Sequence, residues 1–433
     1  MTAPAAAPRH HRTVHRAPVL RLLASALVVG AVGVAGAAVP ATGVAAATAP
    51  LSPVDQRTYD LLSTRSADSR LGPDLAGLVT DLETGQTVWS SHRAERQLPA
   101  SNVKLLTAVN ALAAFGPDHR FRTTVVAGAT SHRVVLVGSG DPSLSRADLR
   151  RLATRTVAAA TAAGTGWVRV DVDDSLFPKP RPARGWRDEY LISEVSPVRA
   201  LVVDQHRRWD TSLDAGRVFA DVLEHKGLDV RRSVSRVTAP VGAATIGEVS
   251  GDDLAATVAD MLRTSDNDVA EGLHRLVALQ SGFRPTWPGA AAAQVAGLAR
   301  LGITLSPGSV YDGSGLSRAD HLSPLDLVAV LRTAFDPAHP ALASLQQGSL
   351  AVAGVSGTLA PDYRRYVTAP TRCAVGLIQA KTGSLRGVVA LSGYARGADG
   401  RLKVFSFLLN HVPSTLATRR AVDRLATTVT GCW

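Results

Sequence analysis

The chain has 433 residues, of which 45% are hydrophobic and 19% charged. This balance is typical of a globular protein and excludes collagen-like, coiled-coil and largely disordered chains. The net charge is +11, but the basic residues form no run with interleaved aromatic side chains, so nucleic-acid binding is not expected.

The N-terminal region has the features of a secretory signal peptide. Residues 22–39 carry no charge, follow four arginines and precede an Ala-x-Ala pattern at residues 45–47. We therefore predict that residues 1–47 are removed on export, which would lower the net charge from +11 to +7. An uncleaved anchor is the alternative, because 18 uncharged residues lie near the lower limit for a membrane-spanning helix. Both alternatives place the rest of the chain outside the cytoplasm.

Residues 48–118 are predicted to combine a helix, a hairpin and a second helix. A serine, a proline and an acid at the start of residues 52–64 predict a capped helix. The β-prone runs at residues 76–82 and 87–90 are separated by Glu-Thr-Gly-Gln, which predicts a hairpin. An apolar helix is expected over residues 101–115, because a Gly-Pro pair follows it.

Residues 119–246 differ from the segments on either side in their pattern of strand-forming and helix-forming runs. This pattern indicates a separate α/β module. Strands are expected over residues 123–127, 133–137 and 168–172, around a helix over residues 146–163. The remaining segment, residues 247–433, should contain three more helices and a strand pair. These elements are expected over residues 252–263, 268–280 and 415–428 for the helices and 387–395 and 402–409 for the strands.

The chain has two cysteines, Cys373 and Cys432. In an exported protein an even number of cysteines is consistent with a disulfide. Two cysteines so far apart are a poor basis for a metal site, and the sequence shows no other cluster of metal ligands.

Ser101-Asn102-Val103-Lys104 places a hydroxyl and an amine three residues apart, on one face of the first turn of the expected helix. Such a pair can act as a nucleophile and its base, although a serine at a helix start is more often only a cap. The motif is short, and alone it is weak evidence.

Two further motifs follow in the chain. Ser265-Asp266-Asn267 lies in the polar turn between two expected helices, and Lys381-Thr382-Gly383-Ser384 lies just before the expected strand pair. Helix capping explains the first of these equally well by itself. All three motifs in this order are instead typical of the serine acyltransferases that react with penicillin.

On these motifs the chain resembles the D-alanyl-D-alanine carboxypeptidase/endopeptidase group of low-molecular-mass class C penicillin-binding proteins. The resemblance extends over residues 137–144, 312–317 and 353–359. Ser101 and Ser265 are 164 residues apart, a larger spacing than in class A β-lactamases, which implies an inserted domain. Family members often nest a further small domain in this insert. Here Asp204 leads within ten residues to a helical stretch near Asp214, so the nested domain is missing.

The implied fold is an α/β (α+β) β-lactamase/transpeptidase-like domain with an antiparallel sheet and a helical lobe. It would be built from residues 48–118 and 247–433 and interrupted by an inserted α/β domain over residues 119–246. We expect one core sheet to combine the N-terminal hairpin with the C-terminal strands.

The resemblance implies an exported serine DD-peptidase that cleaves peptidoglycan stem peptides or their cross-links through an acyl-enzyme, with β-lactams as inhibitors. No cofactor or metal is implied. Ser101 would be the nucleophile and Lys104 its base, while Ser265 would relay a proton and Asn267 would hold the substrate amide. Lys381 would lower the pKa of Lys104 through its like charge.

The remaining predicted site residues would bind substrate. These are Thr382, Gly383 and Ser384, with the backbone N–H groups of Ser101 and Ser384 as oxyanion donors. Arg386 is either a contact of the substrate carboxylate or simply an exposed arginine.

Two other functions remain open on the sequence alone. A non-catalytic cell-wall-binding protein that keeps this fold would be expected to have lost a residue of one of the three motifs. All three motifs are intact in this sequence. A β-lactamase or esterase would need efficient deacylation, and the sequence shows no convincing second general base. The sequence does not separate carboxypeptidase from endopeptidase, and it leaves the oligomeric state open.

Overall fold

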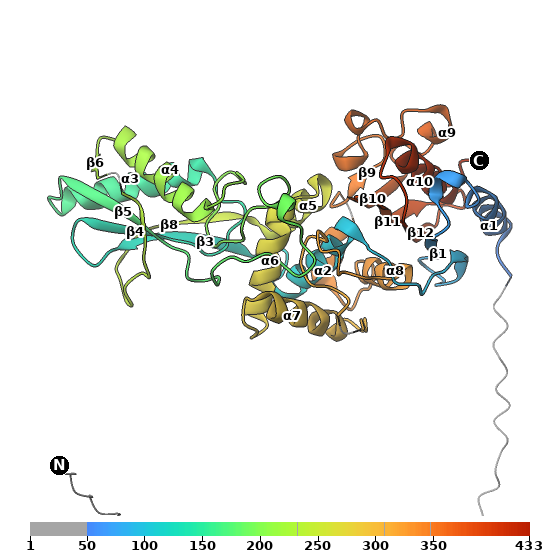
Figure 1. Ribbon diagram of the computed structural model, residues 1–433, viewed down its shortest axis with the longest axis horizontal. Coiled ribbons are helices and arrows are strands. Elements are labelled where there is room, and N and C mark those ends of the chain that lie inside the picture. The colour runs from blue at the N-terminus through green and yellow to red at the C-terminus, as the bar shows by residue number, and fades with distance from the viewer. Residues whose placement is uncertain (1–49, 232, 307, 347) are drawn as a thin grey trace, which may run out of the picture. The chain divides into compact units, whose positions relative to one another are not determined.

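The computed structural model describes residues 50–231, 233–306, 308–346 and 348–433 (Figure 1). The segment predicted to be a signal peptide lies outside these residues. In the part of the chain that is described, no helix combines the length and apolar character needed to cross a membrane.

The first sheet joins the two ends of the described chain. Its strand order is β2-β1-β12-β11-β10-β9, and every neighbouring pair is antiparallel. The strands are β1 (Leu75–Asp81), β2 (Thr87–Ser91), β9 (Ala351–Val352), β10 (Ile378–Leu385), β11 (Val388–Arg396) and β12 (Leu402–Asn410). Strand β1 pairs with β12 from Leu75 opposite Leu409 to Asp81 opposite Lys403. The predicted antiparallel core sheet, built from the N-terminal hairpin and the C-terminal strands, is therefore confirmed.

Helices cover both faces of this sheet, which is why every residue of β1 is buried. Side chains alternate along the strand: Leu75 and Val79 belong to the core shared with α1 and α10, whereas Ala76 and Leu78 belong to the core shared with α2 and α8. The helices are α1 (Pro53–Arg65), α2 (Val103–Phe115), α8 (Pro324–Thr333) and α10 (Leu416–Val429).

Helix α2 is the centre of the helical lobe. All of its residues from Val103 to Leu112 are buried, as expected of a helix that is apolar around most of its circumference. It packs against α8 and against three further helices, α5 (Leu254–Thr264), α6 (Asn267–Gln280) and α7 (Trp287–Arg300). Helices α7 and α8 were not predicted, whereas α5 and α6 lie within two residues of their expected positions.

A second, mixed sheet forms the inserted module (Figure 1, green elements). Its order is β6-β5-β4-β3-β8, with β7 also pairing with β5, and helices α3 and α4 pack on it. The elements are β3 (Arg120–Ala127), β4 (Arg133–Val137), α3 (Arg146–Ala162), β5 (Trp167–Asp173), α4 (Thr211–His225), β6 (Asp229–Val230), β7 (Ser235–Arg236) and β8 (Thr245–Asp253). Strand β8 stays in this sheet as far as Asp253, which pairs with Arg120, so the sheet continues past residue 246.

The loop after β4 contacts the end of β8, just before α5 begins. The Asp141 carboxylate accepts bonds from the backbone N–H and the hydroxyl of Ser143, at 2.9 and 2.7 Å. The Ser143 hydroxyl in turn accepts the N–H of Asp252 at 2.9 Å. A side chain at Gly251 would collide with Asp141 and Ser143, so this close approach requires glycine.

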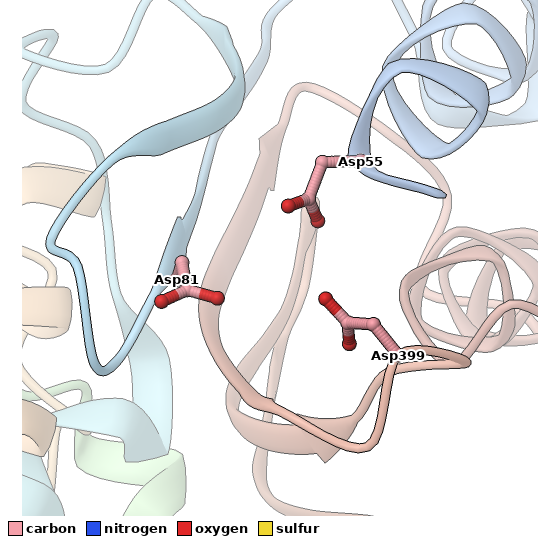
Figure 2. A group of neighbouring side chains, drawn as sticks. All are labelled: Asp55, Asp81 and Asp399. Carbon is pink, nitrogen blue, oxygen red and sulfur yellow. The ribbon is translucent and has the colours of Figure 1, made fainter. Parts of the chain in front are cut away.

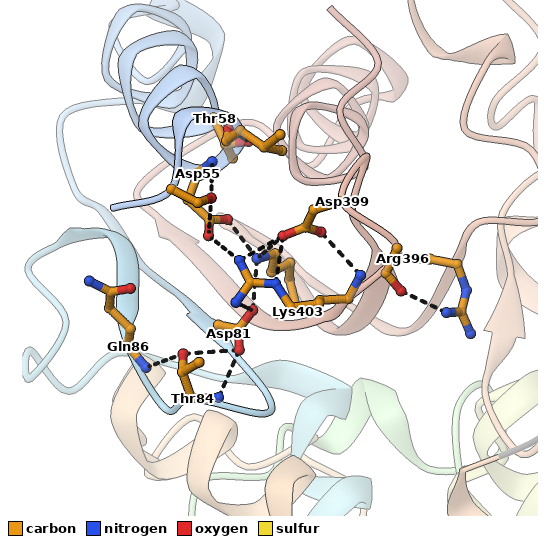
Figure 3. Close-up of polar contacts among 12 residues, drawn as sticks. Asp55, Thr58, Asp81, Thr84, Gln86, Arg396, Asp399 and Lys403 are labelled. Carbon is orange, nitrogen blue, oxygen red and sulfur yellow. Dashed lines mark hydrogen bonds and ion pairs between the residues drawn. The ribbon is translucent and has the colours of Figure 1, made fainter. Parts of the chain in front are cut away.

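Three aspartates from distant parts of the chain meet where α1 joins the sheet. Figure 2 shows Asp55 from α1, Asp81 from β1 and Asp399 from the β11–β12 turn, with carboxylate oxygens within 4.8 Å of one another. Lys403 lies among these three carboxylates (Figure 3), and its Nζ is 2.6, 2.8 and 3.0 Å from them in turn. Arg401 also contacts all three. The sequence did not predict this cluster, in which two side-chain cations take the place that a metal ion would need.

Cys373 and Cys432 form a disulfide. It joins the end of the short helix α9 (Ala369–Arg372) to the residues that follow α10. The cross-linked cysteines are 59 residues apart, and closing a loop of this length contributes up to about 4 kcal/mol on the chain-entropy model. The described residues also form 3₁₀ turns at Ser69–Leu71, Ala100–Asn102, Asp188–Tyr190, Pro340–Leu345, Gly357–Leu359 and Pro361–Tyr363.

Candidate active site

Ser101 lies in the 3₁₀ turn that leads directly into α2, and Lys104 is the second residue of that helix. Ala100, just before Ser101, has a φ of +48°, a left-handed conformation that costs energy for a residue other than glycine. Backbone strain next to a reactive side chain is a feature of many active sites.

Lys104 is fully buried, and its amine contacts three oxygens. Nζ lies 3.2 Å from Ser101 Oγ, 2.6 Å from Asn267 Oδ1 and 2.9 Å from the carbonyl oxygen of Ser314. Burial lowers the pKa of Lys104 from 10.5 to about 8, although nearby carboxyl groups, first that of Glu271, act in the opposite direction. The amine can therefore lose its proton near neutral pH while still donating to Asn267 and Ser314.

Ser265 and Asn267 occupy the turn between α5 and α6. Ser265 ends α5 with a φ of +66°, and Asp266 caps α6 by accepting the N–H of Val269 at 2.8 Å. Asn267 is the first residue of α6, so its side chain is fixed by the start of that helix. Its Oδ1 accepts from Lys104 and its Nδ2 donates to the carbonyl of Glu194 at 2.8 Å. Each end of the amide makes one of these bonds, and an amide can make two at each end, so Asn267 retains hydrogen-bonding capacity for a substrate amide.

Lys381 lies inside β10, directly before the β11–β12 strand pair, as expected. The sequence analysis did not predict that the run after residue 377, which contains the motif, is itself a strand of the sheet. Lys381 is fully buried, and Nζ donates to Ser265 Oγ at 2.9 Å and to the carbonyl of Thr382 at 2.8 Å. Burial, and then the charge of Lys104, hold the pKa of Lys381 well below its usual value.

The two buried lysines have different surroundings. Carboxyl groups near Lys104 favour its charged form, whereas the bonding partners of Lys381 are a hydroxyl and a carbonyl. The sequence-based expectation was that the charge of Lys381 lowers the pKa of Lys104, but burial is the main cause of that shift.

The open edge of β10 borders a pocket of about 690 Å³. Among the described residues, β9 pairs with β10 only at Gln379 and Ala380, so the following residues have no strand on that side. The pocket is lined by most of the predicted site residues, namely Ser101, Ser265, Asn267, Thr382, Gly383 and Ser384, and also by Arg386. The structure thus brings all the predicted site residues together, with Lys104 and Lys381 buried behind the serines.

Two glycines let other segments of the chain approach the turn that carries Ser101. A Cβ at Gly383 would lie 2.9 Å from both the Pro99 carbonyl oxygen and Asn102 Nδ2. A Cβ at Gly315, whose φ is +81°, would lie 1.9 Å from the Ala100 carbonyl oxygen. The K-T-G glycine and the Asp-Gly-Ser-Gly motif are therefore required by close backbone contact with the turn that carries Ser101.

Sequence reasoning missed several groups at this site. Glu271 is fully buried and accepts the backbone N–H groups of Gly313 and Ser314 at 3.0 and 2.8 Å, which positions the carbonyl that Lys104 contacts. A signal was available, because Glu271 lies four residues after Asn267 and so on the same face of α6. On the pocket wall, Thr358 bonds Thr382 through their hydroxyls at 2.7 Å.

The inserted module also reaches the pocket. The pocket is also lined by five of its residues, namely Arg187, Glu189, Tyr190, Glu194 and Arg207. Trp186 in the same segment donates from Nε1 to the Asp312 carboxylate at 2.7 Å, so the segment is joined to the loop behind Lys104.

The comparison with known proteins agrees with this geometry. The family model described as D-Ala-D-Ala carboxypeptidase 3 (S13) matches residues 60–208 and 205–429. A curated carboxypeptidase of Mycobacterium tuberculosis is 34% identical over 400 residues, which cover 86% of this chain and 83% of that protein. The D-alanyl-D-alanine carboxypeptidase of an Actinomadura strain is 28% identical over 443 residues, which cover 80% and 79% of the two chains.

Solved structures show the same fold. The crystal structure of penicillin-binding protein 4 from Haemophilus influenzae superposes with a TM-score of 0.67 at 20% identity, covering 84% of this chain and 97% of that one. The match over both halves of the chain, together with the three motifs around one pocket, shows that this protein belongs to the D-Ala-D-Ala carboxypeptidase 3 (S13) family of peptidases.

Proposed function

We propose that this chain is an exported serine DD-peptidase that acts on peptidoglycan stem peptides through an acyl-enzyme on Ser101. The observation that carries the proposal is the buried Lys104 amine, 3.2 Å from Ser101 Oγ, with its pKa lowered to about 8. A lysine in this state can act as a general base close to neutral pH.

Acylation begins when the neutral Lys104 amine accepts the proton of the Ser101 hydroxyl. At the same time Oγ attacks the carbonyl carbon of the first D-alanine, which is the carbon of the scissile peptide bond. The new bond joins Oγ to that carbon, and the backbone N–H groups of Ser101 and Ser384 are the proposed donors to the oxyanion. Collapse of the intermediate breaks the C–N bond. The proton held by Lys104 returns to the leaving nitrogen by way of the Ser265 hydroxyl, which Lys381 holds in place.

Deacylation is the same sequence with water as the nucleophile. Water attacks the ester carbonyl, the bond from carbon to Ser101 Oγ breaks, and the serine regains its proton. No step requires a metal or an organic cofactor. β-Lactams would acylate Ser101 in the first step, and a solved structure of the H. influenzae relative is described as complexed with a novel β-lactam.

The substrate class rests on the family and on the open edge of β10. An extended peptide can bond to the free backbone groups of an edge strand, as an added strand does. Because β9 leaves β10 after Ala380, this edge is available beside Thr382 and Ser384. A stem peptide lying there would run past both serines of the pocket.

Export is part of the proposal. The basic, apolar and Ala-x-Ala segments of residues 1–47 support it, and so does the Cys373–Cys432 disulfide, since such bonds persist in oxidising compartments. Mass spectrometry of protein recovered from culture medium and cell wall should find a new N-terminus near residue 48. A full-length chain confined to the cytoplasm would contradict export.

The reaction is tested on two purified muropeptides, a monomeric pentapeptide and a cross-linked dimer. A carboxypeptidase releases D-alanine from the first, and an endopeptidase converts the second to monomers. We expect at least one of these products from the purified protein and neither from Ser101→Ala. A parent protein that binds both muropeptides and forms neither product would favour a non-catalytic cell-wall-binding role.

A further inference from the structure

Asp312 begins the loop that passes behind Lys104, and its side chain is fully buried. The carboxylate accepts the backbone N–H of Gly315 at Oδ1 and that of Ser317 at Oδ2, both at 2.7 Å. These bonds close the loop around Ser314, whose carbonyl oxygen lies 2.9 Å from the amine of Lys104. The place of that carbonyl therefore depends on where the Asp312 carboxylate is held.

A third donor to this carboxylate comes from the inserted module. Trp186, 126 residues earlier in the chain than Asp312, donates from Nε1 to Oδ2 at 2.7 Å. A buried carboxylate depends on such donors, because it has lost its contact with water. A hydrogen bond to a charged group is also stronger than one between neutral groups. The inserted module thus helps to hold the side chain that shapes the loop behind the base.

Trp186 is itself fixed by its surroundings. The backbone N–H of Arg318 donates to the carbonyl of the preceding residue, Gly185, at 3.1 Å. A Cβ at Gly185, whose φ is +84°, would lie 2.7 Å from the backbone nitrogen of Ala319, so this close approach requires glycine. The indole ring also packs edge-on against Trp287, with ring centroids 5.2 Å apart. The N–H of Trp186 is therefore held toward the loop.

The same segment contacts a second catalytic motif. Glu194, further along it, lines the pocket, and its carbonyl accepts from Asn267 Nδ2 at 2.8 Å. The inserted module thus contacts Asn267 directly and reaches Lys104 through Asp312. A module that only enclosed the substrate would need neither contact.

We propose that Trp186 and Asp312 act as a positioning pair, through which the inserted module holds the Lys104 amine in place. The inference rests on the proposed function, because Lys104 is the base of that reaction. Neither member of the pair exchanges a proton with the substrate. Among the described residues that line the pocket is Arg187 but not Trp186, so Trp186 acts from behind the base.

Trp186→Phe is the direct test, because it removes the indole N–H and keeps an aromatic ring. At saturating chromogenic β-lactam, we expect the acylation rate constant to fall about tenfold, while the dissociation constant of the preceding complex changes less than about twofold. Tenfold is near the lower end for a lost hydrogen bond to a charged group, since Asp312 keeps two backbone donors. For the muropeptide that the parent cleaves, kcat/KM should fall by the same factor.

The β-lactam separates positioning from substrate binding. A compact β-lactam lacks most of the stem peptide, so a segment that only bound that peptide would leave acylation by the β-lactam unchanged. A displaced base slows both reactions, because small errors in the placement of a catalytic group are costly.

The pH profile gives a second readout. Trp186→Phe leaves the charges near Lys104 unchanged, so acylation should still rise through about pH 8, but to a lower plateau. Burial lowers the pKa of Lys104, and the carboxyl groups of Glu271 and then Asp312 raise it. Asp312→Asn removes one of these carboxylates, so its acylation should rise at a lower pH than that of the parent. A role in packing alone would not move this rise.

Trp209→Phe is the matched control. It is the same substitution in the same module, at a side chain that is 65% exposed, and it should keep the parent values. Rates are expressed per acylated protein, counted from the mass of the penicillin adduct, so that an unfolded fraction does not affect them.

Two results would overturn the positioning pair and leave the proposed function intact. In one, Trp186→Phe is acylated at the parent rate or is slowed only on the muropeptide. In the other, acylation of Asp312→Asn rises at the same pH as that of the parent, which keeps the proposal testable even if Trp186→Phe does not fold. A parent that is not acylated by the β-lactam would overturn the proposed function, and the positioning pair with it.

Discussion

The carbonyl oxygen of Ser314 lies 2.9 Å from Nζ of Lys104. A backbone carbonyl accepts a hydrogen bond from lysine in either protonation state, so it holds the amine toward Ser101 before and after proton transfer. The loop that presents this carbonyl is itself held by the buried carboxylate of Glu271, through the N–H groups of Gly313 and Ser314. The position of the base therefore depends on a side chain that never reaches the pocket.

Glu271→Gln tests this dependence. In the variant, the side-chain amide nitrogen would face one of the two backbone N–H groups that the carboxylate accepts in the parent. That buried N–H would lose its acceptor, which costs about 1 to 3 kcal/mol. We expect the protein to fold and its acylation by a chromogenic β-lactam to slow about 10- to 100-fold, as that energy implies. Glu248→Gln, which removes only a surface ion pair with Arg122, is the control. Acylation of Glu271→Gln at the control's rate would show that the carboxylate does not position Lys104.

The pKa of Lys104 leads to a pH prediction. If Lys104 must be neutral to act, acylation should rise with pH through about 8. Burial is the main cause that lowers this pKa, so Lys381→Ala should leave the rising part of the pH profile in place. The rate should still fall at least about 100-fold, because Ser265 loses its donor.

The measurement is acylation by a chromogenic β-lactam from pH 6 to 10 for the parent, Lys381→Ala and Lys381→Arg. The arginine variant should not recover the full rate, since a planar guanidinium that stays charged does not replace a compact lysine amine in a buried site. A limb that moves upward in Lys381→Ala would mean that Lys381 carries a charge while Lys104 titrates, and that Lys104 loses its proton first.

Gly383→Ala should damage the site more than the fold. The new methyl would lie 2.9 Å from atoms of Pro99 and Asn102, so β10 or the Ser101 turn has to move. We expect a loss of acylation of at least tenfold with about 1 to 3 kcal/mol of destabilisation. Gly272→Ala is the matched control, because a Cβ there meets no atom within 4 Å and the residue is inside α6. It should keep activity and gain up to about 1 kcal/mol. Equal acylation rates for Gly383→Ala and Gly272→Ala would contradict the close contact between Gly383 and the turn that carries Ser101.

Lys403→Met should destabilise the protein without touching the pocket. It leaves Asp55, Asp81 and Asp399 with Arg401 as their only described cation, and breaking a buried ion pair costs about 3 to 5 kcal/mol. Burial raises the pKa of Asp81, but the bonds from Lys403 and Thr84 outweigh it and lower the pKa to about 2. Stability from Asp81 is therefore present above its unfolded pKa of about 4 and is lost as the pH falls toward 2.

Urea unfolding of the parent and of Lys403→Met at pH 7 and pH 3 measures this effect. The difference between the two proteins should be largest at pH 7. An equal difference at both pH values would show that the carboxylates are not charged partners of Lys403.

The sequence predicted the parts of the site that are encoded by side-chain type at fixed spacing. Ser101 and Lys104 share one helix turn, and Lys381 belongs to a motif with few chance matches, so their chemistry could be read before the fold was known. The β-prone runs at both ends of the chain could also be recognised, whereas their union in one antiparallel sheet was implied by the family resemblance. These features are local, and local pattern is what a single sequence reports.

Other features depend on tertiary contacts that leave no local pattern. The Ser314 carbonyl is a backbone group that any residue type would supply. The causes of the Lys104 pKa shift were not predicted, because they are burial and carboxyl groups that come from α6 and from a later loop. Asp55, Asp81 and Asp399 meet only once α1, β1 and the β11–β12 turn are packed together.

The proposed mechanism depends above all on Ser101 being the acylated nucleophile. The direct measurement is mass spectrometry of the intact protein and of its tryptic peptides after incubation with a fluorescent penicillin. We expect the parent to gain the mass of one penicillin, located on the peptide that contains Ser101, and Ser101→Ala to gain none while remaining folded. A penicillin adduct on Ser101→Ala, or an adduct of the parent at any other residue, would contradict the role of Ser101.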